Sequence, residues 1–290
     1  MKNFLKLIRV KHYLKNILVF LPLFFSGNVL NTKLLLLTFI SFLVFSFSSS
    51  IVYIINDISD IENDRKHPIK KNRPLASGKI SIKTAYIIIF ILFLLVSSGI
   101  TYLYLKTHNL LSIIIPIIYI LLNILYSKGL KNIAIIDLLI LTSGFIFRVI
   151  FGAVNIDVEV SKYLYLMIIF GSYYLSLGKR REEINKSGEK SRKVLAKYNK
   201  EFLDKNMYVT YGLSIVSYTL WCVDKEVTLR IGHDYLFWTI PLLMIIFQLY
   251  SLNIEKDSYG DPVDVILSDK KLLITGVIYA IIMILLIYVI

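Results

Sequence analysis

The chain has 290 residues, of which 56% are hydrophobic and only 18% charged, and its mean hydropathy is +0.67. This composition excludes an ordinary soluble domain and predicts a polytopic membrane protein. The formal charge of +13 suits anionic lipid headgroups or a polyphosphate substrate, although retention of cations on the cytoplasmic side would produce much of it. An internal disulfide is excluded, because Cys222 is the one cysteine.

Apolar segments recur along the chain at lengths that cross a hydrocarbon core of about 30 Å as helices. We predict nine of them, near Leu14–Leu30, Leu34–Ile55, Ile82–Leu105, Leu110–Tyr126, Ile133–Val154, Tyr163–Leu177, Met207–Val223, Tyr235–Asn253 and Leu272–Ile290. No soluble domain or linker separates them, so residues 1–290 are expected to form a single transmembrane domain. The longest polar stretch, from Gly178 to Asn206, is compatible with an amphipathic helix on the cytoplasmic side.

The positions of Lys and Arg predict the orientation, because these residues are retained in short cytoplasmic loops. They concentrate in the N-terminal arm and in the connections that follow the second, fourth, sixth and eighth segments. The opposite side holds few of them, namely Lys33, Lys106, Lys162, Lys225 and Arg230. We therefore predict a multi-pass plasma-membrane protein with its N-terminus in the cytoplasm, its C-terminus outside and its active site facing the cytoplasm. Nothing indicates a nucleic-acid partner, and homo-oligomerisation is left open.

Acidic side chains follow the second apolar segment directly, in the stretch NDISDIEND from Asn56 to Asp64. Asp57, Asp60 and Asp64 are spaced i, i+3 and i+7, so they share one face if the helix continues, and Asn56 precedes Asp60 by one turn. Like charges at this spacing cost about 0.2–0.5 kcal/mol per pair. Carboxylates at a helix C-terminus cost about 0.3–1 kcal/mol more. A cation should therefore offset them.

Two interpretations of this acidic cluster follow from the residues. In the first, it is a solvated helix end that neighbouring Arg65, Lys66 and Lys70 neutralise. In the second, it binds Mg2+, which proteins hold with one or two carboxylates while water and substrate phosphate oxygens fill the other positions. The asparagine and the regular spacing favour the second interpretation.

The acidic stretch, together with R-P-L-A-S-G from Arg73, resembles the first aspartate-rich motif of the UbiA superfamily of intramembrane prenyltransferases. The resemblance implies an all-α membrane fold of nine transmembrane helices around a central cavity. It also implies Mg2+ as the cofactor, with Asn56, Asp57, Asp60 and Asp64 as metal ligands and the three aspartates as catalytic residues.

A second aspartate motif, D-x-x-x-D, is expected between the sixth and seventh segments, but the chain reads GKRREEI from Gly178. This departure resembles the decaprenyl-phosphate phosphoribosyltransferase branch, as do HYLKN from His12, YSKGLKNIAIID from Tyr126 and GDPVDVILSDKKL from Gly260. In that branch the donor is 5-phosphoribosyl 1-diphosphate and the acceptor is a polyprenyl monophosphate. The resemblance therefore implies a Mg2+-dependent phosphoribosyltransferase that supplies lipid-linked pentose, such as arabinose, for cell-envelope glycans.

Cations at the predicted inner helix ends suit two substrates that both carry phosphate, although retention on the cytoplasmic side accounts for each cation singly. The predicted substrate-binding residues are Lys15, Asn56, Arg73, Tyr126, Lys131, Asp137, Lys179, Arg180 and Glu183.

Two ionisable residues, Asp137 and Arg148, belong to the fifth segment, where a charge is costly unless it is paired or faces a cavity. They are eleven residues apart, which is about 16 Å along a helix, so they cannot pair with each other. Asp137 is a candidate for the substrate pocket. Arg148 is either structural, bonded to a neighbouring helix, or functional.

Two other functions are alternatives for a polytopic membrane protein. Transfer of a prenyl group from a prenyl diphosphate to an aromatic or other acceptor requires the second aspartate motif, which GKRREEI does not supply. A membrane transporter that uses Asp137 and Arg148 for an ion path would typically show inverted repeats with broken helices, and the sequence shows none.

Overall fold

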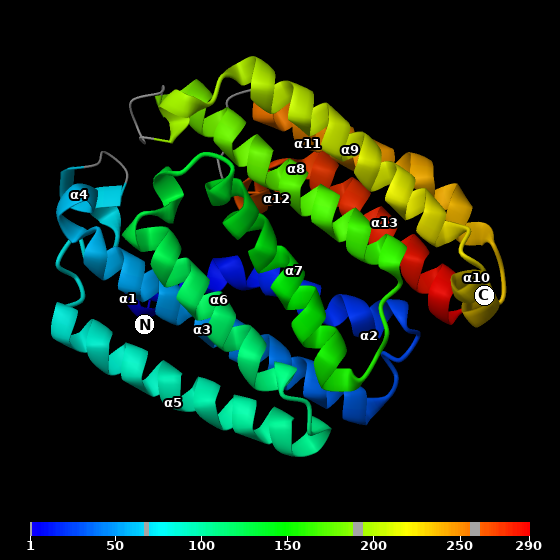
Figure 1. Ribbon diagram of the computed structural model, residues 1–290, viewed down its shortest axis with the longest axis horizontal. Coiled ribbons are helices and arrows are strands. Elements are labelled where there is room, and N and C mark those ends of the chain that lie inside the picture. Colours follow the sequence, from blue (N-terminus) through cyan, green and yellow to red (C-terminus); the bar gives the residue numbers. More distant parts are fainter. Residues whose placement is uncertain (1, 67–69, 188–193, 256–261) are drawn as a thin grey trace. The chain divides into compact units, whose positions relative to one another are not determined.

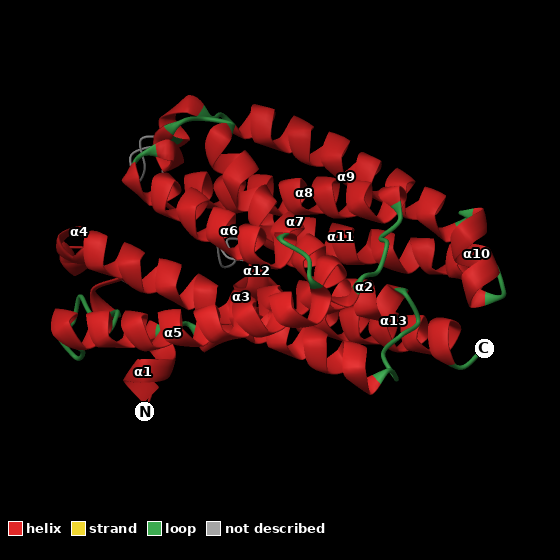
Figure 2. Ribbon diagram, turned by 60° about the horizontal axis from the view of Figure 1, so that its bottom comes forward, coloured by secondary structure: helices red, strands yellow, loops and turns green. Residues whose placement is uncertain are grey.

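The computed structural model describes residues 2–66, 70–187, 194–255 and 262–290, which form helices and loops with no strand among them (Figures 1 and 2). This confirms the predicted all-α class for the described residues. The α-helices are α1 (Lys2–Leu7), α2 (Leu21–Phe25), α3 (Thr32–Ser59), α4 (Ile61–Lys66), α5 (Ile82–Thr107), α6 (Leu111–Lys128), α7 (Ile136–Ile156), α8 (Lys162–Ser187), α9 (Lys200–Cys222), α10 (Lys225–Ile231), α11 (Ile240–Glu255), α12 (Pro262–Ser268) and α13 (Lys270–Tyr288). The 3-10 helices are η1 (Val10–Phe20), η2 (Lys70–Asn72), η3 (Leu130–Asn132), η5 (Leu195–Lys197) and η6 (Tyr235–Thr239).

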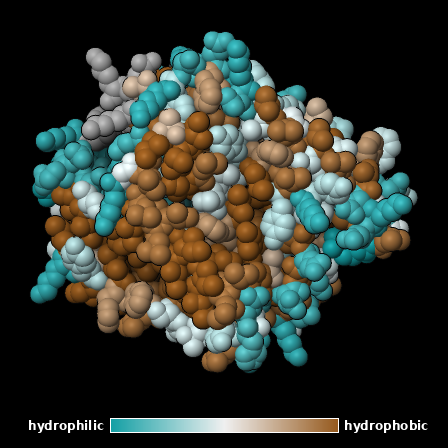
Figure 3. Space-filling view, viewed as in Figure 1, coloured by the Kyte–Doolittle hydropathy of each residue, from teal (hydrophilic) through white to brown (hydrophobic). Residues whose placement is uncertain are grey.

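Among the described residues, six helical segments are long and apolar enough to cross a membrane: α3, α5, α6, α7, α13 and η6 with α11. They coincide with six of the nine predicted segments. The sixth and seventh predicted segments lie within α8 and α9, and the first is divided between η1 and α2. Figure 3 shows broad hydrophobic areas on one face of the protein, bordered by hydrophilic side chains. Such areas suit contact with lipid.

Contacts divide the chain into two compact units. The first comprises Met1–Leu130 with Phe147–Glu159, and the second comprises Lys131–Ile146 with Val160–Ile290. In the first unit α3 packs against α5, α6 and η1, whereas in the second α8 packs against α9 and α11 packs against α13. The single domain predicted for residues 1–290 stays a prediction.

Small and hydroxylated side chains allow α3 to pack closely within the first unit. Ser48 and Ser49 are buried and donate to the carbonyl oxygens four residues earlier, so neither hydroxyl requires water. Opposite this helix, a Cβ atom on Gly99 would lie 2.4 Å from Val44 Cγ2, so only glycine fits there without a shift. The outer face of α5 is apolar and exposed, with Phe90 62% accessible.

The first apolar segment is not the single α-helix that its length predicts. It begins as the 3-10 helix η1 and continues as α2, which has Pro22 in its first turn, where a missing backbone N–H costs little. The backbone of η1 lies against α7 at Gly152, where a Cβ atom would be 2.0 Å from Val19 O. Glycine at this position therefore permits the close approach that brings η1 to α7.

The predicted polar excursion after the sixth segment is helical in part. Helix α8 continues through the charged residues as far as Ser187, and residues 188–193 lie outside the described part of the chain. Helix α9 begins after Asn199, whose side chain caps it by accepting a hydrogen bond from Phe202 N at 2.6 Å.

Candidate active site

Asp57 and Asp64 point toward the same arginine at the end of α3. Helix α3 ends at Ser59 and α4 begins at Ile61, but Asp64 N still donates to Asp60 O at 2.8 Å, so the helical spacing largely persists. Arg73 Nη1 lies 3.1 Å from Asp57 Oδ1 and 2.7 Å from Asp64 Oδ2. The i, i+7 spacing therefore does bring these two carboxylates to one side.

A second arginine, Arg9, completes this cluster. Its Nη2 lies 2.5 Å from Asp57 Oδ1, and its guanidinium lies over the Tyr53 ring, 4.6 Å from the centroid. Arg9 has a positive φ of 53°, an uncommon conformation for a bulky residue. This conformation forms the turn between α1 and η1, and the turn directs the Arg9 side chain to α3.

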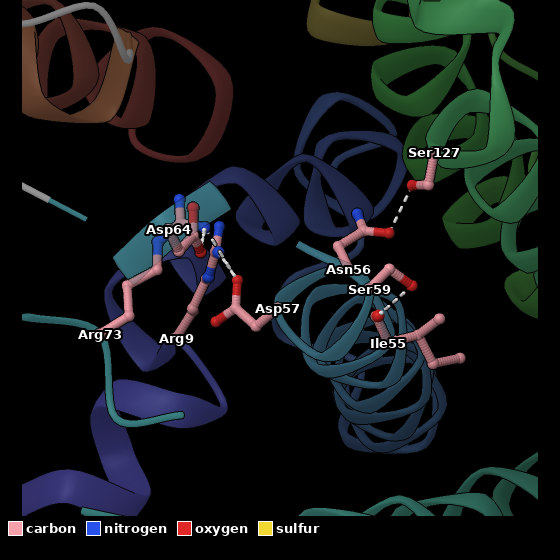
Figure 4. Close-up of polar contacts among 8 residues, drawn as sticks. All are labelled: Arg9, Ile55, Asn56, Asp57, Ser59, Asp64, Arg73 and Ser127. Carbon is pink, nitrogen blue, oxygen red and sulfur yellow. Dashed lines mark hydrogen bonds and ion pairs between the residues drawn. The ribbon is translucent and has the colours of Figure 1, made fainter. Parts of the chain in front are cut away.

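The four side chains form a partly buried cluster of two aspartates and two arginines, whose formal charges cancel (Figure 4). Asp57 and Asp64 are each 3% exposed, whereas the side chains of Arg9 and Arg73 are 20% and 30% exposed. Buried carboxylates are costly unless they are paired, so the arginines offset their burial. The arginines remain accessible to a ligand because water reaches them.

Arg9 and Arg73, which contact these two carboxylates, do not lie next to them in sequence. Arg65 bonds instead to Glu62, with Nη1 2.9 Å from Oε1, and both side chains are exposed. Arg9 and Arg73 therefore contribute to the neutralisation that the first interpretation of the acidic stretch predicts. An arginine fork that meets a carboxylate is also the group that proteins use to bind phosphate.

Asn56 does not join Asp57 and Asp64. Its Oδ1 accepts a hydrogen bond from Ser127 Oγ at the end of α6, and Figure 4 shows Asn56 and Asp57 directed to different sides of α3. Asp60 is the half-buried residue between α3 and α4. Among the described residues, no group of three or more His, Cys, Asp and Glu side chains could hold a metal ion.

Asp57 and Asp64 nevertheless suit a Mg2+ ion that also binds water and substrate phosphate oxygens. Mg2+ commonly takes one or two carboxylates and completes its octahedron with water and substrate phosphate oxygens. Asp57 and Asp64 supply two hard oxygen donors that already converge on one partner, Arg73. These residues therefore suit a magnesium–phosphate ligand and not a site built from protein ligands alone.

The second unit contains another charged cluster, at the start of α7 and the end of α8. Arg180 Nε lies 2.7 Å from Asp137 Oδ2, and Arg180 Nη1 lies 2.6 Å from Glu183 Oε2. Tyr198 donates to Asp137 Oδ1 at 2.6 Å and accepts from Ile135 N at 2.6 Å. Asp137 and Arg180 are fully buried, so the contacts visible in the structure are those of a structural ion pair.

Tyr198 was not predicted as part of a site. Burial, and then its hydrogen bond to Asp137, raise the pKa of Tyr198 above its usual value of 10. The hydroxyl therefore remains protonated at neutral pH and stays a donor to Asp137. Because its pKa is raised in the folded state, its contribution to stability is present below pH 10 and is lost as the pH rises further.

We expect Tyr198→Phe to lower the free energy of unfolding by about 1–3 kcal/mol, because Asp137 and the Ile135 N–H each lose a partner. Thermal melting in detergent at pH 7 measures this loss. Tyr86→Phe is the matched control, since Tyr86 is 58% exposed on α5, and its melting temperature should not change. Equal melting of the two variants would contradict the role assigned to Tyr198.

Arg148 has a structural partner from another element. Its Nε donates to Asn16 Oδ1 at 2.7 Å, and its guanidinium lies 4.8 Å from the centroid of the Phe45 ring. Asn16 belongs to η1, which approaches α7 closely at Gly152, one turn beyond Arg148. Of the two alternatives for Arg148, these contacts favour the structural one.

The other predicted substrate residues lie in four different elements. Lys15 is half-buried in η1, Tyr126 is half-buried near the end of α6, Lys131 lies in η3, and Lys179 is half-buried in α8. Each remains a prediction.

Comparison with known proteins identifies the family. The UbiA prenyltransferase family matches residues 17–264 of the chain. The chain belongs to this family. A decaprenyl-phosphate phosphoribosyltransferase from Corynebacterium glutamicum is 32% identical over 274 residues, which cover 92% of this chain and 81% of that protein. A protein of the same name from Mycobacterium tuberculosis is 29% identical over 277 residues, 92% of this chain and 88% of that one.

Solved structures agree on the fold of this UbiA-family protein. The structure of a UbiA homolog from Archaeoglobus fulgidus bound to GPP and Mg2+ matches with a TM-score of 0.68. The match covers 97% of this chain and 96% of that one at 18% identity, so it shows the fold alone. The predicted family, its all-α fold and its class as a transferase are therefore confirmed.

Proposed function

We propose that the protein transfers 5-phosphoribose from 5-phosphoribosyl 1-diphosphate to a polyprenyl monophosphate, with release of diphosphate and with Mg2+ as cofactor. The observation that carries this proposal is the pairing of Asp57 and Asp64 with two accessible arginines. A metal and a diphosphate need these two kinds of group side by side. The product would feed the synthesis of a lipid-linked pentose, such as arabinose, for cell-envelope glycans.

Two further observations support the phosphoribosyl branch over ordinary prenyl transfer. Relatives that bear the name decaprenyl-phosphate phosphoribosyltransferase align with most of the chain at about 30% identity. In addition, Arg180 and Glu183 stand in the stretch where a second aspartate motif is expected, and Arg180 forms a buried pair with Asp137. That pair would stabilise this part of the fold and would not hold a second metal.

In the proposed reaction the protein binds and orients the donor. Asp57 and Asp64 would hold Mg2+ together with the diphosphate, and bound there the ion would stabilise the negative charge that grows on the leaving diphosphate. Arg9 and Arg73 would bind the diphosphate oxygens, for which their planar guanidinium groups are suited. Asp60, in the turn between α3 and α4, is proposed as a further ligand, and Asn56 as a group that orients this end of α3.

The bond between ribose C1 and the diphosphate oxygen breaks, and a phosphate oxygen of the lipid forms the new bond to C1. The second pKa of a phosphate monoester is about 6, so this oxygen is already deprotonated at neutral pH. No strong general base is therefore required from the protein. We further propose that nine spans surround a central cavity, with the N-terminus and the active site on the cytoplasmic side of the plasma membrane.

The test is a transfer assay with purified protein in lipid nanodiscs, Mg2+ and donor labelled in the ribose. Label should enter the lipid only when a polyprenyl monophosphate is supplied, and excess chelator should abolish the transfer. A parallel reaction supplies a prenyl diphosphate and an aromatic acid. Prenylation of the acid, with no label in lipid, would overturn the proposal in favour of ordinary prenyl transfer.

A further inference from the structure

A pocket of about 370 Å³ lies in the second unit, between the last turns of α8, the first turns of α9 and the last turns of α11. Neither charged cluster described above contributes to its lining. The volume is within the range of sites that bind small molecules or headgroups, about 300–1,000 Å³. The pocket therefore has room for a ligand that the proposed reaction does not use.

Two buried polar atoms of the lining have no hydrogen-bond partner within the part of the chain that the structure describes. They are Arg181 Nη1 and Tyr211 Oη. The Tyr211 ring packs against Phe247, with centroids 5.4 Å apart, and Arg181 Nε is held by Asp204 Oδ1 at 2.7 Å. Leaving such groups unpaired costs about 1–3 kcal/mol each. Ligand oxygens that accept hydrogen bonds from these two groups would offset this cost.

The charges of the lining indicate what else the ligand carries. Arg181 is one cation, whereas Asp204 and Glu255 are two acids, and Asp204 is already bonded to Arg181. A purely anionic ligand would face an excess of negative charge. A ligand that joins an anionic oxygen to an ammonium group would complement all three residues.

The surface next to the pocket indicates a lipid. Tyr208 lines the pocket and is 67% exposed. Beside it begins a stripe of exposed apolar residues, which runs along α9 away from the pocket at the i, i+4 and i+7 positions of one face, Val209, Leu213 and Val216. The acyl chains of a lipid would cover this apolar stripe, whereas a soluble phosphate compound has no apolar chain to do so.

We propose that this pocket binds the headgroup of a membrane phospholipid that carries both a phosphate and a primary ammonium, as phosphatidylethanolamine does. The phosphate accepts hydrogen bonds from Arg181 and Tyr211, the ammonium lies between Asp204 and Glu255, and the acyl chains lie along the exposed stripe of α9. The lipid site is separate from the proposed transferase site, so the proposal for the lipid does not depend on the proposed reaction.

Native mass spectrometry of the delipidated, full-length protein tests the proposal. Phosphatidylethanolamine, phosphatidylglycerol, phosphatidylcholine, glycerophosphoethanolamine and inorganic phosphate are titrated separately. We expect one tightly retained phosphatidylethanolamine, with weaker retention of the two other lipids and of both soluble compounds. Equal retention of the three lipids would overturn the proposal, as would equal binding of glycerophosphoethanolamine, which would assign the pocket to soluble compounds.

Variants then connect the lipid to the pocket. Tyr211→Phe removes one oxygen and Arg181→Gln removes the charge, and each should weaken phosphatidylethanolamine binding about tenfold. Lys205→Gln is the control, because Lys205 is 72% exposed on the same helix, and it should bind normally. Glu255→Gln should weaken phosphatidylethanolamine and strengthen phosphatidylglycerol, a reversal that misfolding cannot produce. Unchanged selectivity in Glu255→Gln, or normal binding in Tyr211→Phe, would refute the site.

Discussion

Replacing Asp57 with asparagine is expected to lower the rate of transfer at least about 100-fold. The substitution keeps the size of the side chain but removes the charge that would hold Mg2+ against the diphosphate. A metal in this position would contribute several kcal/mol of charge stabilisation, and each 1.4 kcal/mol or so is a factor of ten in rate. Initial rates with labelled donor, over a range of Mg2+ concentrations, measure the effect.

Glu62→Gln provides the matched control for Asp57→Asn. Glu62 is a nearby acid on α4, its side chain is 74% exposed, and it pairs with Arg65. The same chemical change should leave the rate within about twofold of the parent, because exposed pairs contribute little. Similar losses in both variants, or full activity in Asp57→Asn, would contradict the metal site.

The second large effect is expected on stability. Arg180→Met should lower the free energy of unfolding by about 3–5 kcal/mol, because it leaves the buried carboxylate of Asp137 without its cation. Asp137→Leu should cost a similar amount, because it removes the buried carboxylate that pairs with Arg180. The double variant should cost much less than the sum of the two, since an apolar pair replaces an ionic one.

Thermal melting of the four proteins in one detergent measures this coupling. Lys205→Gln is again the control, because its ion pair with Glu201 is exposed and should contribute less than about 1 kcal/mol. Strictly additive losses in the double variant would show that Asp137 and Arg180 do not stabilise each other. Activity measured on the folded fraction then tests whether Arg180 also contacts substrate.

The parts of the site that follow from local geometry were predictable from the sequence. The spacing of Asp57 and Asp64 predicted that they share one side, and both do contact Arg73. The apolar lengths likewise predicted six of the segments that the structure identifies as candidate spans. Helical periodicity decides the first feature and the length of each apolar segment decides the second, so neither required knowledge of distant contacts.

The parts that depend on tertiary contacts were not predictable. Arg9 lies 48 residues before Asp57 and reaches it through a left-handed turn, and nothing in its neighbourhood distinguishes it from the other cations of the N-terminal arm. Tyr198 lies 61 residues after Asp137. Asn56 turned away from Asp57 because successive residues of a helix point about 100° apart, and Ser127 is available on its other side.

The direct test of the proposed donor site is a structure of the protein with 5-phosphoribosyl 1-diphosphate and Mn2+ in place of Mg2+, in which the anomalous signal locates the metal. We expect the metal at the carboxylates of Asp57 and Asp64, with the diphosphate bound beside it by Arg9 and Arg73. A metal and diphosphate bound elsewhere, with the ion pairs of Arg9 and Arg73 to Asp57 intact, would show that these four residues do not form the donor site.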